Sequence, residues 1–548
     1  MCASQAPIEI YDSTLRDGAQ AEGIAYSLED KLLIARRLDA LGVHYIEGGW
    51  PNPTNPKDLA FFRRVRRLGL KARITAFGST RRPGRPPGED ETLGMLLKAG
   101  TPTVTIFGKS WSLHVERVLR CSLDDNLALI EDSVAHLARH GREVLYDAEH
   151  FFDGYRADPA YALETLLAAE RGGARLAVLC DTNGGALPSA VAAAVQAARS
   201  RVRLPLGIHA HNDAGVAVAN TIVAVEQGAV HVQGTFNGYG ERCGNANLCV
   251  VIPDLELKLN RRTIGRRGMA GLMAFSRFLS EIANVHHDHR QPYVGESAFA
   301  HKGGVHVDAM VKELTTYEHC PPGAVGNSRR FLLSDQSGSS AVASKLARLC
   351  PGLDKRDPVV ARLVRELKRL EHEGYQYEAA EASFELLAQR VMGRFQERFS
   401  LINFRTINRK TGTRSEEAEA IVKVAVDGRV IHTVAEGDGP VNALDRALRR
   451  ALEGEFPCLG AVRLEDYKVR VLSSRDGTAA KVRVLIESSD GQDAWGTVGV
   501  STNIIEASWI ALADSLHYKL LKEARRSVPA ASRQRRSPGR QEARRARS

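Results

Sequence analysis

The chain has 548 residues, of which 43% are hydrophobic and 26% charged, an ordinary composition for a globular protein. This length predicts roughly two to four domains with large cores. No apolar run approaches the ~20 residues that a membrane-spanning helix needs, and no secretory signal is visible, so we expect no membrane association. Eight scattered cysteines without a C-x-x-C pair predict reduced thiols and a cytoplasmic location.

The net charge of +10 is concentrated at the C-terminal end of the chain. From Arg525 onward nine arginines accompany one glutamate, Glu542, so this segment carries +8 and the rest of the chain 10 − 8 = +2. A basic segment without apolar periodicity cannot bury enough surface to order itself, and we expect residues 523–548 to be a disordered tail. A weak contact with a polyanion is the alternative, but nucleic-acid binding is not expected to be the main function.

The N-terminal part of the chain alternates short apolar runs with amphipathic helical patterns such as 28–41, 123–139 and 187–199. Strand–helix units repeated at this spacing predict an α/β fold, a (β/α)8 TIM barrel, over residues 6–270 rather than an open sheet. The predicted strands are 8–11, 44–48, 72–77, 104–107, 144–148, 176–180, 206–210 and 230–234.

Polar side chains gather at or just after the C-terminal ends of these predicted strands. A TIM barrel carries its active site on that face, so their recurrence indicates one shared site. The residues are Asp12, Arg16, Asp17, Glu47, Glu149, Asp181, Thr182, His209, His211 and Asn237.

Two of these segments have the residue types of a divalent-metal site. In His209-Ala-His211 the two histidines share one face of a strand, because side chains two residues apart point the same way. Asp17 adds a hard oxygen ligand, and a mixed nitrogen and oxygen set suits Mn, Zn, Fe or Mg better than calcium. Two histidines satisfied by backbone groups in the core are the less favoured alternative.

Residues 271–392 have a mainly helical pattern, as at 341–349 and 359–370, interrupted by a Gly- and His-rich stretch at 297–308. Residues 393–522 contain an internal repeat in which a strand hairpin precedes a helix. The first copy has strands within 421–434 and a helix at 441–452, and the second has strands at 482–491 and 494–502 and a helix at 504–520. We expect a small α+β domain here.

Three motifs together resemble the metal-dependent acyl-CoA synthases and lyases with a barrel fold. They are the D-x-T-L-R-D-G segment 12–18, the H-x-H-N-D segment 209–213 and the segment Gly238-Tyr-Gly-Glu-Arg-Cys-Gly-Asn245. This group contains the 2-isopropylmalate, homocitrate and citramalate synthases and 3-hydroxy-3-methylglutaryl-CoA lyase. The segment 299–318 favours the synthase branch, and the terminal repeat resembles its amino-acid-sensing domain.

Within this group the segments 46–51, 55–58 and 107–111 are most similar to the (R)-citramalate synthases. The resemblance implies a Claisen condensation of acetyl-CoA with pyruvate and hydrolysis of the thioester, in isoleucine biosynthesis. A 2-isopropylmalate synthase, which takes 2-oxoisovalerate, is the alternative, because the sequence does not show which side chains surround the acceptor's alkyl group.

The resemblance also implies roles for individual residues. Asp17, His209 and His211 would hold the ion, Mn or Mg being favoured and Zn the alternative, with Asn245 as a direct or water-bridged contact. Arg16 would stabilise the developing alkoxide and bind substrate. Glu149 would be the catalytic base. Asp147 is the alternative base, and if it is not the base it would contact the substrate. Thr182 would contact the substrate carboxylate.

His306 and Tyr317 lie outside the predicted barrel. In the family the matching residues belong to the partner subunit and complete its active site, so the resemblance implies at least a homodimer. The terminal domain is expected to bind isoleucine as a feedback inhibitor. Leucine is the alternative effector, and a dimerisation domain that has lost sensing is the structural alternative.

Overall fold

The computed structural model describes residues 7–332, 342–343, 345–346, 353, 356–409, 417–472, 477 and 479–526. The helix predicted at 341–349 and the tail beyond Arg526 therefore lie largely or wholly outside the described residues. The chain divides into two compact units, Met1–Ala300 with Glu318–Arg330 and His301–Tyr317 with Phe331–Ser548. Among the described residues no helix combines the length and the apolar character needed to cross a bilayer.

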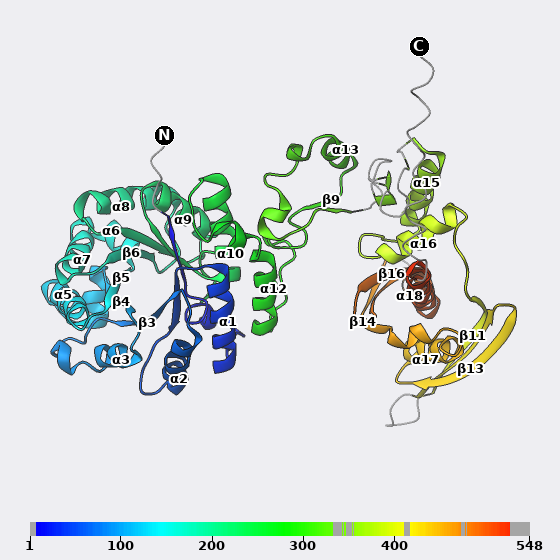
Figure 1. Cartoon of the computed structure of the whole chain (residues 1–548), viewed down its shortest axis with the longest axis horizontal. Helices are drawn as coiled ribbons and strands as arrows, with labels where there is room; N and C mark the ends of the chain where they lie inside the picture. The colour runs from blue at the N-terminus through cyan, green and yellow to red at the C-terminus, as the bar shows by residue number, and fades with distance from the viewer. Residues whose placement is uncertain are drawn as a thin grey trace, which may run out of the picture. The chain divides into compact units, whose positions relative to one another are not determined.

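The first unit is a closed barrel of eight parallel strands in the order of the sequence, which confirms the predicted (β/α)8 fold (Figure 1). Each observed strand lies within about two residues of the predicted one, because each is a short apolar run bounded by polar or glycine-containing segments. The strands are β1 (Glu9–Asp12), β2 (Tyr45–Gly49), β3 (Arg73–Ser79), β4 (Thr103–Lys109), β5 (Glu143–Glu149), β6 (Leu176–Asp181), β7 (Leu206–Ala210) and β8 (His231–Gly234).

Helices surround the barrel, and local sequence signals begin and end several of them (Figure 1). Ser27 and Asp30 form a capping box at the start of α1, and Gly42 ends this helix in the left-handed conformation. The helices of this unit are α1 (Leu28–Leu41), α2 (Pro56–Val65), α3 (Glu91–Ala99), α4 (Ser112–His114), α5 (Leu123–Arg139), α6 (Phe151–Ala157), α7 (Pro159–Gly172), α8 (Pro188–Arg201), α9 (Ala217–Glu226), α10 (Leu248–Pro253), α11 (Gly265–Met269) and α12 (Leu272–Ala283).

Strand alternation separates the hydrophobic core from the polar interior of the barrel. Ile46, Ile106 and Ile208 are fully buried in the core cluster that the helices share with the strands. Their neighbours Glu47 and His209 point to the barrel interior instead. The interior near the C-terminal ends of the strands is therefore polar, as a site for chemistry requires.

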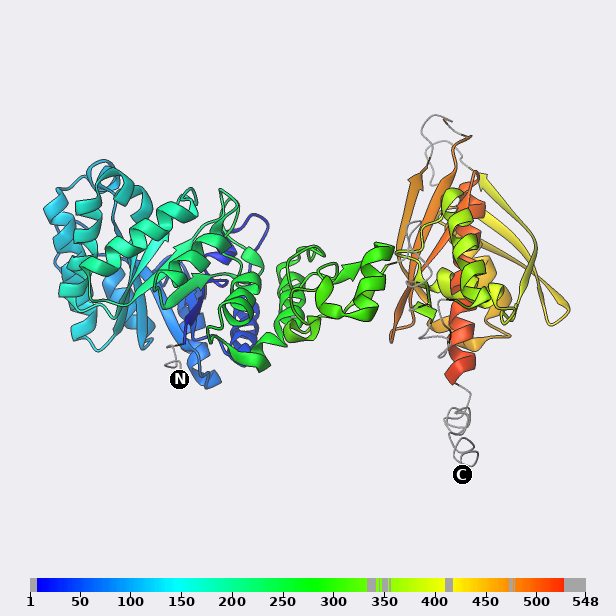
Figure 2. The same ribbon diagram turned by 90° about the horizontal axis from the view of Figure 1, so that it is seen from above.

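The second unit contains two antiparallel three-stranded sheets, one for each copy of the sequence repeat. Helix α17 packs against the first sheet and α18 against the second, and Figure 2 shows α18 lying between the two sheets. The sheets consist of β11 (Ser400–Arg409), β12 (Glu417–Val426) and β13 (Arg429–Gly437), and of β14 (Arg463–Val471), β15 (Val482–Ser489) and β16 (Ala494–Ser501). Strands β11 and β14 were not predicted.

Among its described residues the second unit has the helices α13 (Gly304–Lys312), α15 (Pro358–His372), α16 (Glu381–Val391), α17 (Pro440–Leu452) and α18 (Ile504–Arg526). Two short strands, β9 (Ala300–His301) and β10 (Arg330–Phe331), pair with each other. Helix α16 packs against α18: Ser383 donates a hydrogen bond to Asp514 at 2.9 Å, and Arg390 donates another at 2.8 Å. Helix α18 continues to Arg526, which lies within the segment predicted as a tail.

Candidate active site

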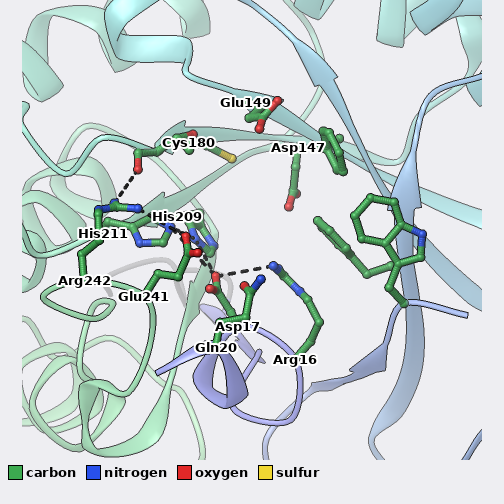
Figure 3. A pocket seen from close by; sticks show the side chains of 14 residues that line it. Arg16, Asp17, Gln20, Asp147, Glu149, Cys180, His209, His211, Glu241 and Arg242 are labelled. Atoms are coloured by element: carbon green, nitrogen blue, oxygen red, sulfur yellow. Dashed lines mark hydrogen bonds and ion pairs between the residues drawn. The ribbon is translucent and has the colours of Figure 1, made fainter. Parts of the chain in front are cut away.

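The C-terminal ends of the barrel strands surround a pocket of about 200 Å³ (Figure 3). Side chains that are distant in the sequence meet there because the eight strands end on one face of the barrel. The predicted site residues that line this pocket are Arg16, Asp17, Asp147, Glu149, Thr182, His209 and His211. Asn237 lies elsewhere, since its amide donates to the Ser276 carbonyl at 2.9 Å and so attaches α12 to the barrel.

Asp17, His209 and His211 form the one metal-type cluster of His, Cys, Asp and Glu side chains among the described residues. Their ligand atoms all lie within 4.8 Å of one another. The Nε2 atom of His209 is 3.3 Å from both Oδ2 of Asp17 and Nε2 of His211. The amide nitrogen of Asn245 donates to Oδ2 of Asp17 at 2.9 Å, so this side chain borders the cluster.

The electrostatics of the cluster favour an ionised Asp17 and a neutral His211, whereas the pKa of His209 is raised because the neighbouring Asp17 carboxylate outweighs the effect of burial. Burial raises the pKa of Asp17, but the charge of the Arg16 guanidinium outweighs it and holds this pKa well below its usual range. Burial and the charge of His209 lower the pKa of His211 to about 4, so its imidazole is neutral near pH 7. Ionised aspartate and neutral imidazole are the forms that bind metals.

One buried atom beside this cluster, the amide oxygen Oδ1 of Asn245, has no hydrogen-bond partner among the described residues. A native structure seldom leaves such atoms unpaired, and a cluster of imidazole nitrogens and hard oxygens matches the preferences of Mn, Mg or Zn. The residues present therefore fit a divalent ion.

Arg16 is fixed beside the cluster by a buried network. Its Nη1 atom is 3.7 Å from Oδ2 of Asp17, and its Nε atom forms an ion pair with the fully buried Glu47. Glu47 in turn accepts a hydrogen bond of 2.5 Å from the Tyr11 hydroxyl. The guanidinium lies 3.8 Å from the centre of the Phe77 ring. The Arg16 charge is thus held in one place at the edge of the pocket.

The two candidate bases on β5, Asp147 and Glu149, have different surroundings. Burial and the charge of Glu47 raise the pKa of Asp147 to about 7, although His209, Arg16 and a hydrogen bond from Gln233 act in the opposite direction. Glu149 ends the strand, is 22% exposed and forms an ion pair with Lys109. Both side chains point into the pocket from the same strand (Figure 3).

Thr182 is held at the edge of the pocket by two contacts, one to its hydroxyl oxygen and one to its carbonyl oxygen. Its Oγ1 atom accepts a hydrogen bond from the backbone N–H of His150 at 2.9 Å. Arg242 donates to the Thr182 carbonyl at 2.8 Å and is itself held by Asp213. Arg242 and its neighbour Glu241 also line the pocket and were not predicted, although both belong to the motif Gly238–Asn245.

One wall of the pocket is aromatic. The rings of Phe77 and Phe107 stack with centroids 5.5 Å apart, and the Trp50 indole meets both edge-on at 5.7 and 5.6 Å. All three line the pocket beside Arg16. Sequence reasoning missed this wall, although Trp50 and Phe107 lie in segments that carry the resemblance to citramalate synthases.

His306 and Tyr317 belong to the second compact unit. Their rings stack with centroids 4.1 Å apart and an interplanar angle of 25°. Both are exposed on that unit, Tyr317 to 43%. The stacked pair therefore lies at the surface of the second unit.

Comparisons with known proteins agree with this architecture. Family models match residues 7–266 (HMGL-like), 293–375 (homocitrate synthase post-HMGL domain-like) and 378–520 (LeuA allosteric, or dimerisation, domain). The chain is 52% identical to an (R)-citramalate synthase of Geobacter sulfurreducens, over 94% of this chain and 98% of that one.

The chain belongs to the (R)-citramalate synthase family. A second member, from Aquifex aeolicus, is 50% identical over 95% of this chain and 99% of that one. A 2-isopropylmalate synthase of Methanocaldococcus jannaschii is 29% identical over 94% of this chain and 95% of that one. The family indicated by the sequence motifs is confirmed, and so is the closer similarity to citramalate synthases.

Proposed function

We propose that the chain condenses acetyl-CoA with pyruvate and hydrolyses the resulting thioester, releasing (R)-citramalate and CoA. One observation carries this proposal: a metal-type cluster, a fixed arginine and an aromatic wall meet in one pocket. Five (R)-citramalate synthases with 47–52% identity to this chain support the choice of substrates. The product would serve isoleucine biosynthesis. The cysteines among the described residues form no disulfide, which is consistent with the proposed location in the cytoplasm.

Asp17, His209 and His211 would hold the ion, with Asn245 as a direct or water-bridged contact. When bound, a divalent ion supplies Lewis acidity that polarises the carbonyl of a 2-oxo acid. The mixed imidazole and carboxylate set suits Mn, Zn, Fe or Mg, and the family resemblance favours Mn or Mg, with Zn as the alternative. The hydroxyl of Thr182 would donate a hydrogen bond to the substrate carboxylate.

Two residues around this cluster would transfer the proton and stabilise the charge that the reaction requires. Glu149 would take a proton from the acetyl methyl group, and its ion pair with Lys109 orients the carboxylate for this step. Arg16 would stabilise the negative charge that develops on the acceptor oxygen, because its guanidinium stays charged and is fixed by Glu47.

The aromatic wall supports pyruvate as the acceptor. Trp50, Phe77 and Phe107 occupy volume beside Arg16 and restrict the alkyl group of the acceptor in a pocket of about 200 Å³. A hydrophobic pocket can exclude a larger substrate by steric contact even though it discriminates poorly against a smaller one. A 2-isopropylmalate synthase would need room for an isopropyl group at this wall.

A panel of 2-oxo acids tests the function. Purified protein with acetyl-CoA should release free thiol fastest with pyruvate and much more slowly with 2-oxoisovalerate. Phe107→Ala should reduce the difference in rate between pyruvate and 2-oxoisovalerate, whereas Phe107→Leu should preserve most of this difference. Faster turnover of 2-oxoisovalerate by the wild-type protein would instead assign a 2-isopropylmalate synthase.

We further propose that isoleucine binds the terminal domain and inhibits the enzyme, with leucine as the alternative effector. Support comes from the family model over residues 378–520, whose description is an allosteric domain. The turn 436–439 leads into α17, whose first residue, Pro440, has no N–H, so a carboxylate would be received by the backbone N–H groups that follow it in the first turn. Calorimetry should detect binding of the amino acid to the intact protein. To inhibit, the amino acid must bind the less active state of the enzyme more tightly than the active state. No binding of either amino acid at millimolar concentration would leave a purely structural domain.

A further inference from the structure

A buried glutamine on β8, Gln233, connects one metal ligand with an active-site carboxylate. Its Oε1 atom lies 2.9 Å from Nδ1 of His209, and its Nε2 atom donates to Oδ1 of Asp147 at 3.0 Å. Gln233 is fully buried, and His209 and Asp147 are 5% and 4% exposed. No function described above uses this residue.

Strand pairing brings these side chains together. In the barrel register Gln233 on β8 is the direct partner of His209 on β7, so both side chains project from neighbouring strands on the same face of the sheet. The contact therefore follows from closure of the barrel, and the sequence separation of 24 residues gives no local sign of it.

The two neighbours of Gln233 determine how its side-chain amide is oriented. The NH₂ group of Gln233 donates to Oδ1 of Asp147 at 3.0 Å, and a carboxyl oxygen can accept this hydrogen bond in either protonation state. The carbonyl oxygen of Gln233 then faces His209 and accepts a hydrogen bond from Nδ1–H. This leaves the lone pair on Nε2 of His209, the atom that lies 3.3 Å from Asp17.

The other histidine of the cluster lacks such support. Nδ1 of His211 is buried without a hydrogen-bond partner in the described part of the chain. The protein thus fixes the tautomer of one histidine ligand through Gln233 and leaves the other without an equivalent side chain.

We propose that Gln233 is a positioning residue that selects the metal-binding tautomer of His209 and orients its ring through Asp147. The inference rests on the proposed metal site. Partners of this kind behind a histidine ligand typically contribute about 10–100-fold to metal affinity.

The test measures Mn²⁺ affinity of the full-length protein directly, from the EPR signal of the free ion, without any turnover. Gln233→Met keeps the length of the side chain but replaces the carbonyl acceptor for His209 with a weakly accepting thioether, and it should weaken Mn²⁺ binding about 10–100-fold. Gln233→Glu restores an acceptor for Nδ1–H and should bind Mn²⁺ within about threefold of wild type or more tightly. Asp147→Asn should weaken binding by less than Gln233→Met, because the amide loses only its orienting partner.

Asn220→Leu is the matched control, since it removes a buried amide of the same unit that donates to the Ala186 carbonyl and touches no ligand. It should lower the melting temperature and leave Mn²⁺ affinity unchanged. Wild-type affinity in a folded Gln233→Met variant would overturn the positioning role while leaving the metal site intact. Failure of the wild-type protein to bind Mn²⁺ would overturn the metal site and the inference with it.

Discussion

At the scale of single residues, Asp147 and Glu149 show how environment separates two carboxylates on one strand. Asp147 is enclosed by Arg16, Gln233 and the barrel interior, whereas Glu149 lies at the strand end beside Lys109. A base for the acetyl methyl group must reach a second substrate that enters from the open face of the barrel. Glu149 meets that requirement better than the deeper Asp147.

Glu149→Gln should therefore lower kcat about 100-fold or more and leave the KM for pyruvate within about threefold, because general bases contribute 10²–10⁴-fold to the rate and the acceptor binds elsewhere in the pocket. Steady-state kinetics with varied pyruvate measures both constants. A larger loss of kcat in Asp147→Asn than in Glu149→Gln would transfer the role of base to Asp147.

Removal of the metal should abolish turnover without unfolding the barrel. The proposed ligands Asp17, His209 and His211 lie outside the hydrophobic core cluster of the first unit, so that core does not depend on an ion. Treatment with a chelator should eliminate thiol release, and added Mn²⁺ or Mg²⁺ should restore it, while the circular dichroism spectrum stays constant. Full activity in the metal-free protein would contradict the proposed role of the cluster.

Sequence reasoning grouped Asp17, His209 and His211 because their relation is local or carried by a motif, and the structure brings the three side chains together. His209 and His211 share a strand face by virtue of a two-residue spacing, and Asp17 follows the first strand. Trp50, Phe77 and Gln233 act through contacts made only when the barrel closes, so no spacing in the sequence indicates them. Lys109 was missed for the same reason, because its ion pair with Glu149 joins neighbouring strands 40 residues apart.

At the scale of elements, the C-terminal ends of the barrel strands form the candidate active site, whereas the N-terminal ends contribute to stability. Near the N-terminal end of β1, Glu9 accepts hydrogen bonds from Arg175, one of them 2.8 Å long, and lies 3.3 Å from Nδ1 of the buried His231. Burial raises the pKa of Glu9, but the hydrogen bonds with His231 and Arg175 outweigh it and lower this pKa to about 2. This end of a TIM barrel typically serves stability.

Because the folded-state pKa of Glu9 lies below its unfolded value of 4.5, its carboxylate stabilises the fold above about pH 4.5, and this contribution is lost as the pH falls toward about 2. Glu9→Gln should cost about 2 kcal/mol of unfolding free energy at pH 7 and leave kcat unchanged. Urea unfolding at several pH values should show the difference from wild type shrinking below pH 4.5. A constant difference down to pH 2 would exclude the carboxylate as its source.

The elements of the second unit were predicted where apolar alternation is strong and missed where it is weak. The hairpins β12–β13 and β15–β16 and the helices α17 and α18 follow clear patterns. Strand β11 is largely exposed and β14 is rich in charged residues, so neither shows the two-residue alternation of a half-buried strand. A bulge in each, at Leu401/Asn403 and Leu464/Asp466, disturbs the pattern further.

At the scale of the whole molecule, the structure indicates where the chain can be shortened. Helix α16 packs with α18, and Phe384 and Leu387 of α16 share a hydrophobic cluster with Val498 of β16. A protein that ends after Met392 would expose these side chains and should aggregate or lose stability. A protein that ends after Arg526 keeps the ion pair between Arg525 and Glu385 and should retain wild-type kcat and melting temperature.

The second truncation also tests the basic tail. Residues 527–548 contain seven arginines and one glutamate, so their removal lowers the net charge by 7 − 1 = 6. Retention on a polyanion column should fall, since such binding depends on the number of cationic contacts. Turnover that falls together with polyanion binding would instead link the tail to catalysis.

The homodimer that the family resemblance implies can be tested only in the assembled protein. If His306 completes the active site of the partner subunit, Asp17→Ala and His306→Ala inactivate different parts of the same site. A heterodimer of these two variants would then have one site with both defects and one site with neither. Co-expression with two affinity tags and purification through both should yield about half the wild-type activity per dimer, although each variant alone is nearly inactive. If His306 instead serves the barrel of its own chain, both sites of the heterodimer carry one defect each, and the purified heterodimer should be as inactive as its parents.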